Sequence, residues 1–212
     1  MTTNRLKNIW SQVPPDYYEK GITRNFFQKL WHIRKWMIVK KMIQGTKPRR
    51  VLDVGCASGW LAARVAKMLP KALVTGVDVS PKMIDYAKVV HPNINFIKAD
   101  AHKLPFSDGS FDLIICTETL EHVVDPLRVL GEIKRCLIPK GEAIISMDTG
   151  SLLFKIIWFF WTKAKGRVWR KAHLHKFNKN KLQKLFAQAN FKVVEQQISH
   201  LGMAMTFRLR RT

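Results

Sequence analysis

The sequence predicts an α/β fold built on a doubly wound parallel sheet, and two observations carry that prediction. Short apolar segments alternate along the chain with segments of helical periodicity, which is the order that produces strands joined by crossover helices. The first apolar segment ends in a glycine-bearing turn that leads directly into a helix. With 212 residues, 47% of them apolar, the chain can bury the core of one domain, which we expect to span residues 1–212.

The N-terminal part is expected to be helical. Pro14 and Pro15 mark a break, and the stretch from Arg24 to Gln44 has the apolar spacing of three and four residues that is typical of a helix. A Gly-Thr-Lys-Pro segment at 45–48 ends that helix. The apolar residues at this spacing are Phe26, Leu30, Ile33 and Met37.

The remaining elements follow in order. Ser80 and Pro81 fit the N-cap and the first position of a helix, and Asp125-Pro126 begins another in the same way. Strands are expected at the short apolar runs 50–54, 73–77, 94–98, 111–116 and 141–146, and at the closing pair 191–198 and 203–209. Further helices are expected over 60–69 and 179–189.

Charge divides the chain into a nearly neutral centre and two basic arms. Residues 51–148 carry 11 basic and 12 acidic side chains, whereas residues 1–50 carry 12 and 2, and residues 149–212 carry 14 and 1. Six of the seven tryptophans also lie in the arms, which favours a polyanionic partner, either nucleic acid or an anionic membrane surface. The predicted parts are a basic helical arm (1–48), a core (49–148), a basic aromatic insertion (149–176) and a C-terminal helix with strands (177–212).

Several classes of protein are excluded by what the sequence lacks. Three cysteines, Cys56, Cys116 and Cys136, are too few and odd in number for a disulfide scaffold, and they fit a reducing cytoplasm. The N-terminal residues show no apolar signal-peptide stretch, and no apolar run reaches the roughly 18 residues of a membrane-spanning helix.

Polar and glycine residues follow the first three strands in a pattern that predicts a ligand site. Gly55 and Gly59 bound the turn after the first strand, where glycine leaves room for a ligand beside the backbone. Asp78 ends the second strand, where a carboxylate can accept hydrogen bonds from both hydroxyls of a ribose. Asp100-Ala101 follows the third strand, next to the position of a purine ring. The glycine turn alone also fits a purely structural strand–helix connection, and the order of all three elements is the more specific signal.

This arrangement resembles the class I S-adenosylmethionine-dependent methyltransferases over about residues 30–200. The first turn has the form of Asp53 followed by GxxxG, not the GxGxxG of dinucleotide-binding proteins, and Ala57 stands where that family usually has a middle glycine. The segment FSDGSFDLIIC at 106–116 is also typical of the family. Two signatures, ETLEHV at 118–123 and HKF at 175–177, are most similar to the ubiquinone-biosynthesis O-methyltransferases and related small-molecule methyltransferases.

The resemblance implies a Rossmann-like, seven-stranded, mostly parallel sheet with an antiparallel last strand, N-terminal helices, and a lid or interfacial insertion after the fifth strand. It implies S-adenosyl-L-methionine as the cofactor, with its ribose on Asp78, its sulfonium close to the backbone of Thr117, and its carboxylate on an N-terminal arginine. Arg34 is the candidate for that arginine, with Lys35 one position away. The implied cofactor-binding residues are Arg34, Asp53, Gly55, Gly59, Asp78, Asp100, Ala101 and Thr117.

Glu118, Glu121 and His122 are the candidate catalytic and metal-binding residues. If the segment is helical, their spacing places all three on one face, where they suit a divalent cation such as Mg²⁺ that activates an acceptor hydroxyl. Enzymes of the ubiquinone group resemble this in using Mg²⁺ at matching positions. Two other interpretations stay open: His122 acts as a general base oriented by a glutamate such as Glu121, or the group only ties the strand–helix junction together.

The insertion contains nine apolar residues in the ten from Leu152 to Trp161, followed by basic residues at 163, 165, 167, 170 and 171. Such a helix is too short to span a bilayer and suits either an interfacial helix at a membrane or a lid over the substrate pocket. His173 and His175 follow, either in contact with solvent or the lid, or as a second acid–base group that enters the pocket from the lid.

Together these features predict a cytoplasmic methyltransferase, peripheral at the inner face of the membrane, that O-methylates a small or lipid-soluble acceptor such as a quinone precursor. RNA is the alternative substrate, because basic arms with aromatic residues also suit stacking on single strands. A catalytically silent, cofactor-binding membrane partner is the third interpretation. The aromatic residues cluster in contiguous apolar blocks, which favours the membrane over RNA.

Overall fold

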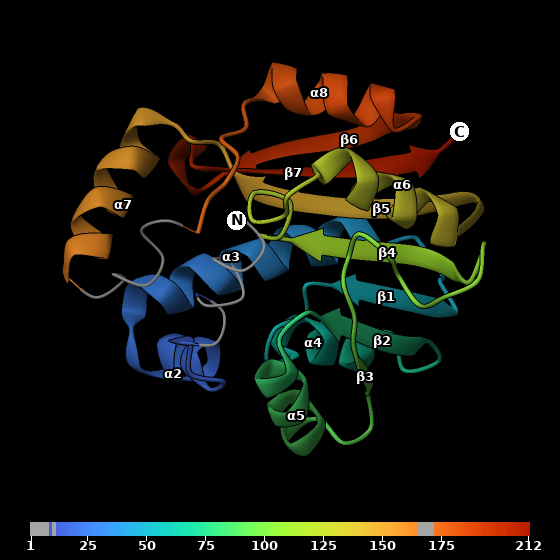
Figure 1. Ribbon diagram of the computed structural model, residues 1–212, viewed down its shortest axis with the longest axis horizontal. Coiled ribbons are helices and arrows are strands. Elements are labelled where there is room, and N and C mark those ends of the chain that lie inside the picture. Colours follow the sequence, from blue (N-terminus) through green and yellow to red (C-terminus); the bar gives the residue numbers. More distant parts are fainter. Residues whose placement is uncertain (1–8, 10–11, 165–171) are drawn as a thin grey trace.

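The structure is a computed structural model that describes residues 9, 12–164 and 172–212. Its centre is a seven-stranded sheet in the order β3-β2-β1-β4-β5-β7-β6 (Figure 1). The five strands from β3 to β5 pair in parallel, and β7 pairs antiparallel with both β5 and β6, which confirms the predicted sheet and its antiparallel last strand. The strands are β1 (Arg50–Val54), β2 (Leu73–Asp78), β3 (Asn95–Lys98), β4 (Phe111–Thr117), β5 (Leu137–Asp148), β6 (Phe191–Ser199) and β7 (Ala204–Arg211).

Helices cover both faces of the sheet because successive strand residues point to opposite sides. Val51 and Ile115 pack with one set of helices, and Leu52 and Ile114 with the other. The first set is α3 (Phe26–Ile43), α4 (Trp60–Met68) and α5 (Pro81–Val90); the second is α6 (Pro126–Cys136) and α8 (Lys179–Gln188). The carboxyl ends of the parallel strands all point toward one edge, on the left in Figure 1, which is where such sheets bind ligands.

The helix predicted over 24–44 is confirmed as α3, which spans Phe26–Ile43. A further helix that was not predicted, α2 (Tyr17–Arg24), precedes it, and the two meet at Asn25. The backbone of Asn25 is extended, and its side chain accepts hydrogen bonds from the amides of Phe27 and Gln28, so it starts a new helix.

The insertion after β5 forms α7 (Leu152–Ala164), which stands at the far left of Figure 1 beside the carboxyl edge of the sheet. Among the described residues, no helix combines the length and the apolar character needed to cross a membrane. The basic residues predicted at 165, 167, 170 and 171 lie outside the described part of the chain.

Several boundaries shift by a few residues. β5 begins at Leu137 rather than at Gly141, because α6 runs directly into it. A short 3-10 helix, η2 (His200–Gly202), separates β6 from β7.

Candidate functional site

The turn after β1 borders a large cavity of about 530 Å³ at the carboxyl edge of the sheet. Gly55 has a φ of +76°, and a Cβ at this position would lie 2.2 Å from the Thr119 hydroxyl. Only glycine therefore allows the turn to pass beneath the loop that follows β4. The amides of Gly55 and Cys56 donate to the carbonyl of Val77, which joins the turn to β2.

Asp78 lies in the wall of this cavity, at the end of β2. One carboxylate oxygen accepts from the amide of Ala57 at 3.0 Å, and the other from the amide of Ser80 at 2.8 Å. These bonds fix the carboxylate with one hydrogen bond on each oxygen, so each keeps a lone pair toward the cavity. Burial raises the pKa of Asp78, and hydrogen bonding to the backbone amides of Ser80, Ala57 and Val79 opposes this rise.

Asp100 and Ala101 line the same cavity from the loop after β3, as predicted from their position in the chain. Asp100 accepts from the amide and from the ring of His102, at 2.9 and 2.7 Å. Although partial burial opposes it, the hydrogen bonding with His102 lowers the pKa of Asp100. Val79, Met83 and Val124 supply apolar walls that suit a flat aromatic ring.

A second, smaller cavity of 80 Å³ shares Gly55 and Ala57 with the first. Asp53, Thr117 and Lys35 line it. Asp53 is buried with one carboxylate oxygen that has no hydrogen-bond partner, and burial raises the pKa of Asp53 to about 7. A buried carboxylate oxygen without a hydrogen-bond partner suits a bound ligand that carries a cationic donor group.

Two predicted cofactor residues do not line either cavity. Arg34 is exposed to solvent, whereas its neighbour Lys35 is buried at 6% exposure and its ammonium lies 3.1 Å from a carboxylate oxygen of Glu118. Gly59, with a φ of +83°, precedes α4, and a Cβ there would lie 2.6 Å from the ring of Phe96. Glycine at 59 thus lets the turn pack closely on Phe96, and cofactor binding by Arg34 and Gly59 stays a prediction.

The segment after β4 is a turn, and the prediction that Glu118, Glu121 and His122 share one helical face is wrong. Glu118 has a φ of +51° and pairs with Lys35. Glu118 lines both cavities, so the ion pair stands between them.

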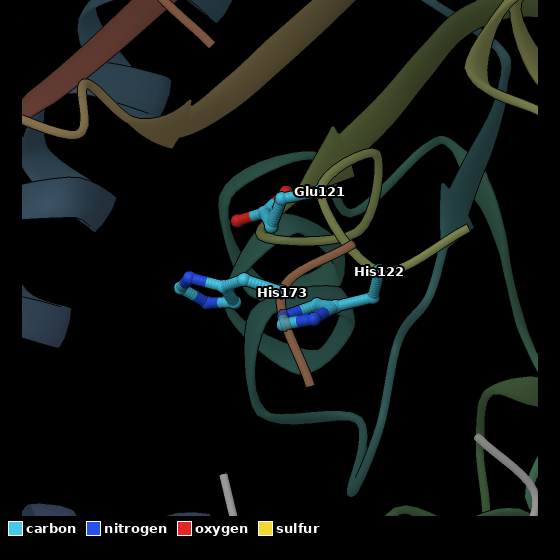
Figure 2. A group of neighbouring side chains, drawn as sticks. All are labelled: Glu121, His122 and His173. Atoms are coloured by element: carbon cyan, nitrogen blue, oxygen red, sulfur yellow. The ribbon is translucent and has the colours of Figure 1, made fainter. Parts of the chain in front are cut away.

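Figure 2 shows the group that does come together, which is Glu121, His122 and His173. One potential ligand atom from each lies within 4.8 Å of the others. Glu121 is 1% exposed and neither of its carboxylate oxygens has a hydrogen-bond partner. Burial, followed by the charges of Glu118 and Asp148, raises the pKa of Glu121 well above its usual range.

Mg²⁺ does not fit this group. Magnesium demands near-octahedral oxygen ligands, whereas two of the three converging groups are imidazoles and the carboxylate of Glu118 is held by Lys35. The set of two imidazoles and one carboxylate suits Zn²⁺ better. The group that converges thus contains His173 in place of Glu118, and metal binding at these residues stays a prediction.

His122 lines the large cavity, and a backbone carbonyl from the segment after α7 contacts its ring. Its Nδ1 lies 3.0 Å from the carbonyl oxygen of Ala172. Because a carbonyl can only accept, Nδ1 carries the proton and Nε2 carries the ring's lone pair in the neutral imidazole. Burial lowers the pKa of His122, so the ring is neutral near pH 7. The carbonyl of Ala172, and not a glutamate as predicted, orients the ring.

The segment after α7 closes over this turn. The carbonyl of Glu121 accepts from the amides of Leu174 and His175, and the His175 ring donates to the carbonyl of Val123 at 2.9 Å. His173 stacks on Trp158 with ring centroids 4.5 Å apart, and burial lowers the pKa of His173 to about 3. Of the two predicted roles for these histidines, lid contact is the one that the geometry matches.

Tyr18 is a cavity residue that sequence reasoning missed. It lines both cavities from α2, and burial raises the pKa of its hydroxyl. Its ring packs edge-to-face on His32, at 6.0 Å. No local pattern marks it, because α2 reaches the cavity only through the fold of the whole arm.

Residues 52–145 match the protein family described as Methyltransferase domain. The chain is 32% identical over 141 residues to a demethylmenaquinone methyltransferase of Chlorobaculum tepidum, which covers 66% of this chain and 58% of the relative. It is 40% identical over 104 residues to a ubiquinone biosynthesis O-methyltransferase of Coxiella burnetii, covering 47% of this chain and 44% of the relative. The match thus spans about half the length of these curated relatives.

The fold is similar to that of a solved structure from Thermotoga maritima, described as a SAM-dependent methyltransferase and possible histamine N-methyltransferase. The TM-score is 0.75 at 23% identity, over 98% of this chain and 100% of that one. At this identity the likeness concerns the fold, which extends over the arms as well as the core.

Proposed function

Because the chain contains a class I S-adenosylmethionine-dependent methyltransferase domain, we propose that it transfers a methyl group to a hydroxyl oxygen of a small, lipid-soluble acceptor. The observation that carries the proposal is the neutral His122 in the wall of the large cavity, with its lone pair fixed on Nε2. A neutral base beside a cofactor cavity is what removal of an acceptor proton requires.

The cofactor, when bound, supplies an electrophilic methyl group on a sulfonium. In this proposal Asp78 accepts from the two ribose hydroxyls, and Asp100 and Ala101 face the adenine. Lys35 pairs with the cofactor carboxylate, in place of Arg34, and the orphaned oxygen of Asp53 accepts from its ammonium. The backbone at Gly55 and Thr117 leaves room for the part of the cofactor between its ribose and its amino-acid group.

His122 would accept the proton of the acceptor hydroxyl while the methyl–sulfur bond of the cofactor is exchanged for a methyl–oxygen bond, and the cofactor would leave as a neutral thioether. The rest of the rate enhancement comes from alignment and from exclusion of water, since direct displacement requires no covalent enzyme nucleophile. The buried side chain of Glu121 helps to shape the turn that carries His122, so Glu121 is a positioning residue.

An apolar acceptor is favoured by the surroundings of His122. The ring lies 4.7 Å from that of His173, which stacks on Phe154 and Trp158 of α7. Two curated relatives are named a demethylmenaquinone methyltransferase and a ubiquinone biosynthesis O-methyltransferase, and a flat quinone-type ring suits this aromatic lid. A lipid-soluble acceptor of this kind is held in a membrane, so the proposal implies work at a membrane surface.

The test is to incubate the protein with methyl-labelled S-adenosylmethionine and cell extract, and to partition the products. The proposal predicts label in the organic phase that depends on the protein. Label in the RNA fraction would instead support RNA methylation, which the basic arms also suit. Cofactor binding without label in any fraction would support the catalytically silent interpretation.

A further inference from the structure

The outward face of α7 is apolar, which is unusual for a helix at the surface of a protein. Its six large apolar residues that face solvent are between 40% and 73% exposed. At about 100° per residue they cover an arc of roughly 160°. These residues are Leu152, Leu153, Ile156, Ile157, Phe159 and Phe160.

The inward face of the same helix is also apolar, and it is already occupied. Trp158 and Trp161 pack against the buried cluster around Met83, together with Tyr18 and Ala57. The outward residues are therefore not needed to hold α7 on the protein, and their exposure needs another explanation.

Two segments next to α7 also expose apolar side chains. The ring of Trp31 in α3 lies 6.5 Å from that of Phe154 in α7 and 4.1 Å from that of His200 in η2. Phe27 precedes Trp31 by one helical turn and is 79% exposed, and Leu201 follows His200 and is 82% exposed. We call the exposed apolar residues of α7, together with Phe27, Leu30 and Leu201, the docking face.

Charge identifies what the docking face fits. Neither α3 nor α7 contains an acidic residue. The exposed cations of these two helices are Lys29, Arg34, Lys40, Lys41, Lys155 and Lys163. An apolar helix face bordered by lysines and arginines, without acids, matches the interface of an anionic lipid bilayer.

We propose that the docking face seats the protein on an anionic membrane surface, with α7 lying in the interface. This inference rests on the proposed function and names the source of its acceptor. Trp158 of α7 packs against the same buried cluster as Tyr18, which lines the large cavity, so a bilayer on the outer side of α7 is separated from the site by this helix. A lipid-soluble acceptor then reaches His122 without passing through water.

The experiment is flotation of the full-length protein with vesicles of phosphatidylcholine, alone or mixed with phosphatidylglycerol. The proposal predicts binding to the mixed vesicles that falls as salt is added. The double variant Ile156→Ser/Phe160→Ser removes two exposed side chains and should lower the partition coefficient on the order of tenfold or more. A matched control, Leu73→Ser/Val89→Ser, removes side chains that are 75% and 80% exposed elsewhere, and should float like the unchanged protein.

Several outcomes would overturn the proposal. The first is that the unchanged protein does not float with the mixed vesicles. The second is that the Ile156→Ser/Phe160→Ser variant floats as well as the unchanged protein. A third outcome is that the unchanged protein self-associates or binds RNA, and that the variant loses this property but still floats. The docking face would then bind a second copy of the chain or a nucleic acid. Binding of S-adenosylhomocysteine and label transfer to detergent-dispersed lipids are measured on the same variants. Flotation without transfer contradicts the proposed function alone, and transfer without flotation contradicts the docking face alone.

Discussion

Replacing Asp78 by Asn should sharply weaken cofactor binding, because both carboxylate oxygens are already set by backbone amides. The amides of Ala57 and Ser80 hold one oxygen each, at 3.0 and 2.8 Å, which leaves the second lone pair of each oxygen for a ribose hydroxyl. An Asn presents an NH₂ group to one of those amides, so it cannot satisfy both amides and both hydroxyls.

The expected loss follows from two hydrogen bonds to a charged group. At about 1.5 kcal/mol each, they amount to about 3 kcal/mol, or roughly 100-fold in affinity. Calorimetric titration with S-adenosylhomocysteine measures the loss, and adenosine, which lacks the amino-acid part, should lose affinity by the same factor. Asp85→Asn, at an exposed position of α5, is the control. If a folded Asp78→Asn protein, judged by its thermal melt, binds within threefold of the unchanged protein, the ribose assignment is refuted.

Three further predictions concern the other parts of the site. Lys35→Met should lower the affinity for S-adenosylhomocysteine about tenfold or more and leave the affinity for adenosine unchanged, because Lys35 is proposed to pair with the cofactor carboxylate. Arg34→Met is the matched control, and an equal effect of the two variants would contradict the proposal that Lys35, and not Arg34, binds this carboxylate. Cofactor affinity should rise with pH and level off above about 7, since burial raises the pKa of Asp53 to about 7 and only the ionised carboxylate pairs with the ammonium. Asp53→Asn should flatten that profile, and an unchanged profile would remove Asp53 from the site. Dialysis against a chelator should leave turnover unchanged, because no step depends on a metal; loss of turnover restored by Zn²⁺ would instead make Glu121, His122 and His173 a metal site.

The strands and the glycine turn could be predicted from the sequence because their signals are local. A buried parallel strand is a short apolar run, and the turn after it needs glycine where φ is positive, as at Gly55. The position of Asp78 and Asp100 at the carboxyl edge then follows from the strand order.

The orientation of α3 could not be predicted, although the helix itself could. Its periodic residues Phe26, Leu30 and Met37 are exposed, and the buried ones are Ile38, Val39, Met42 and Ile43. Only the C-terminal half of α3 packs on the sheet, so the N-terminal half has no core to cover. The rotation of the helix also decides that Lys35, and not Arg34, faces the cavity.

The group around His122 depended on contacts between distant parts of the chain. Helical spacing suggested Glu118 as a partner, but the positive φ at that residue turns it toward Lys35. His173 arrives from the insertion, about 50 residues later, through stacking on Trp158. Such a contact leaves no local pattern in the sequence.

The most direct measurement compares label transfer by the unchanged protein and by His122→Gln, with methyl-labelled S-adenosylmethionine and an organic extract of cells as acceptor. The account predicts that the variant binds the cofactor with unchanged affinity and transfers label at least about 100-fold more slowly, because it lacks the base. Transfer by His122→Gln at the rate of the unchanged protein would contradict the assignment of His122. No transfer by either protein, with the cofactor bound, would contradict the proposed methyl transfer itself.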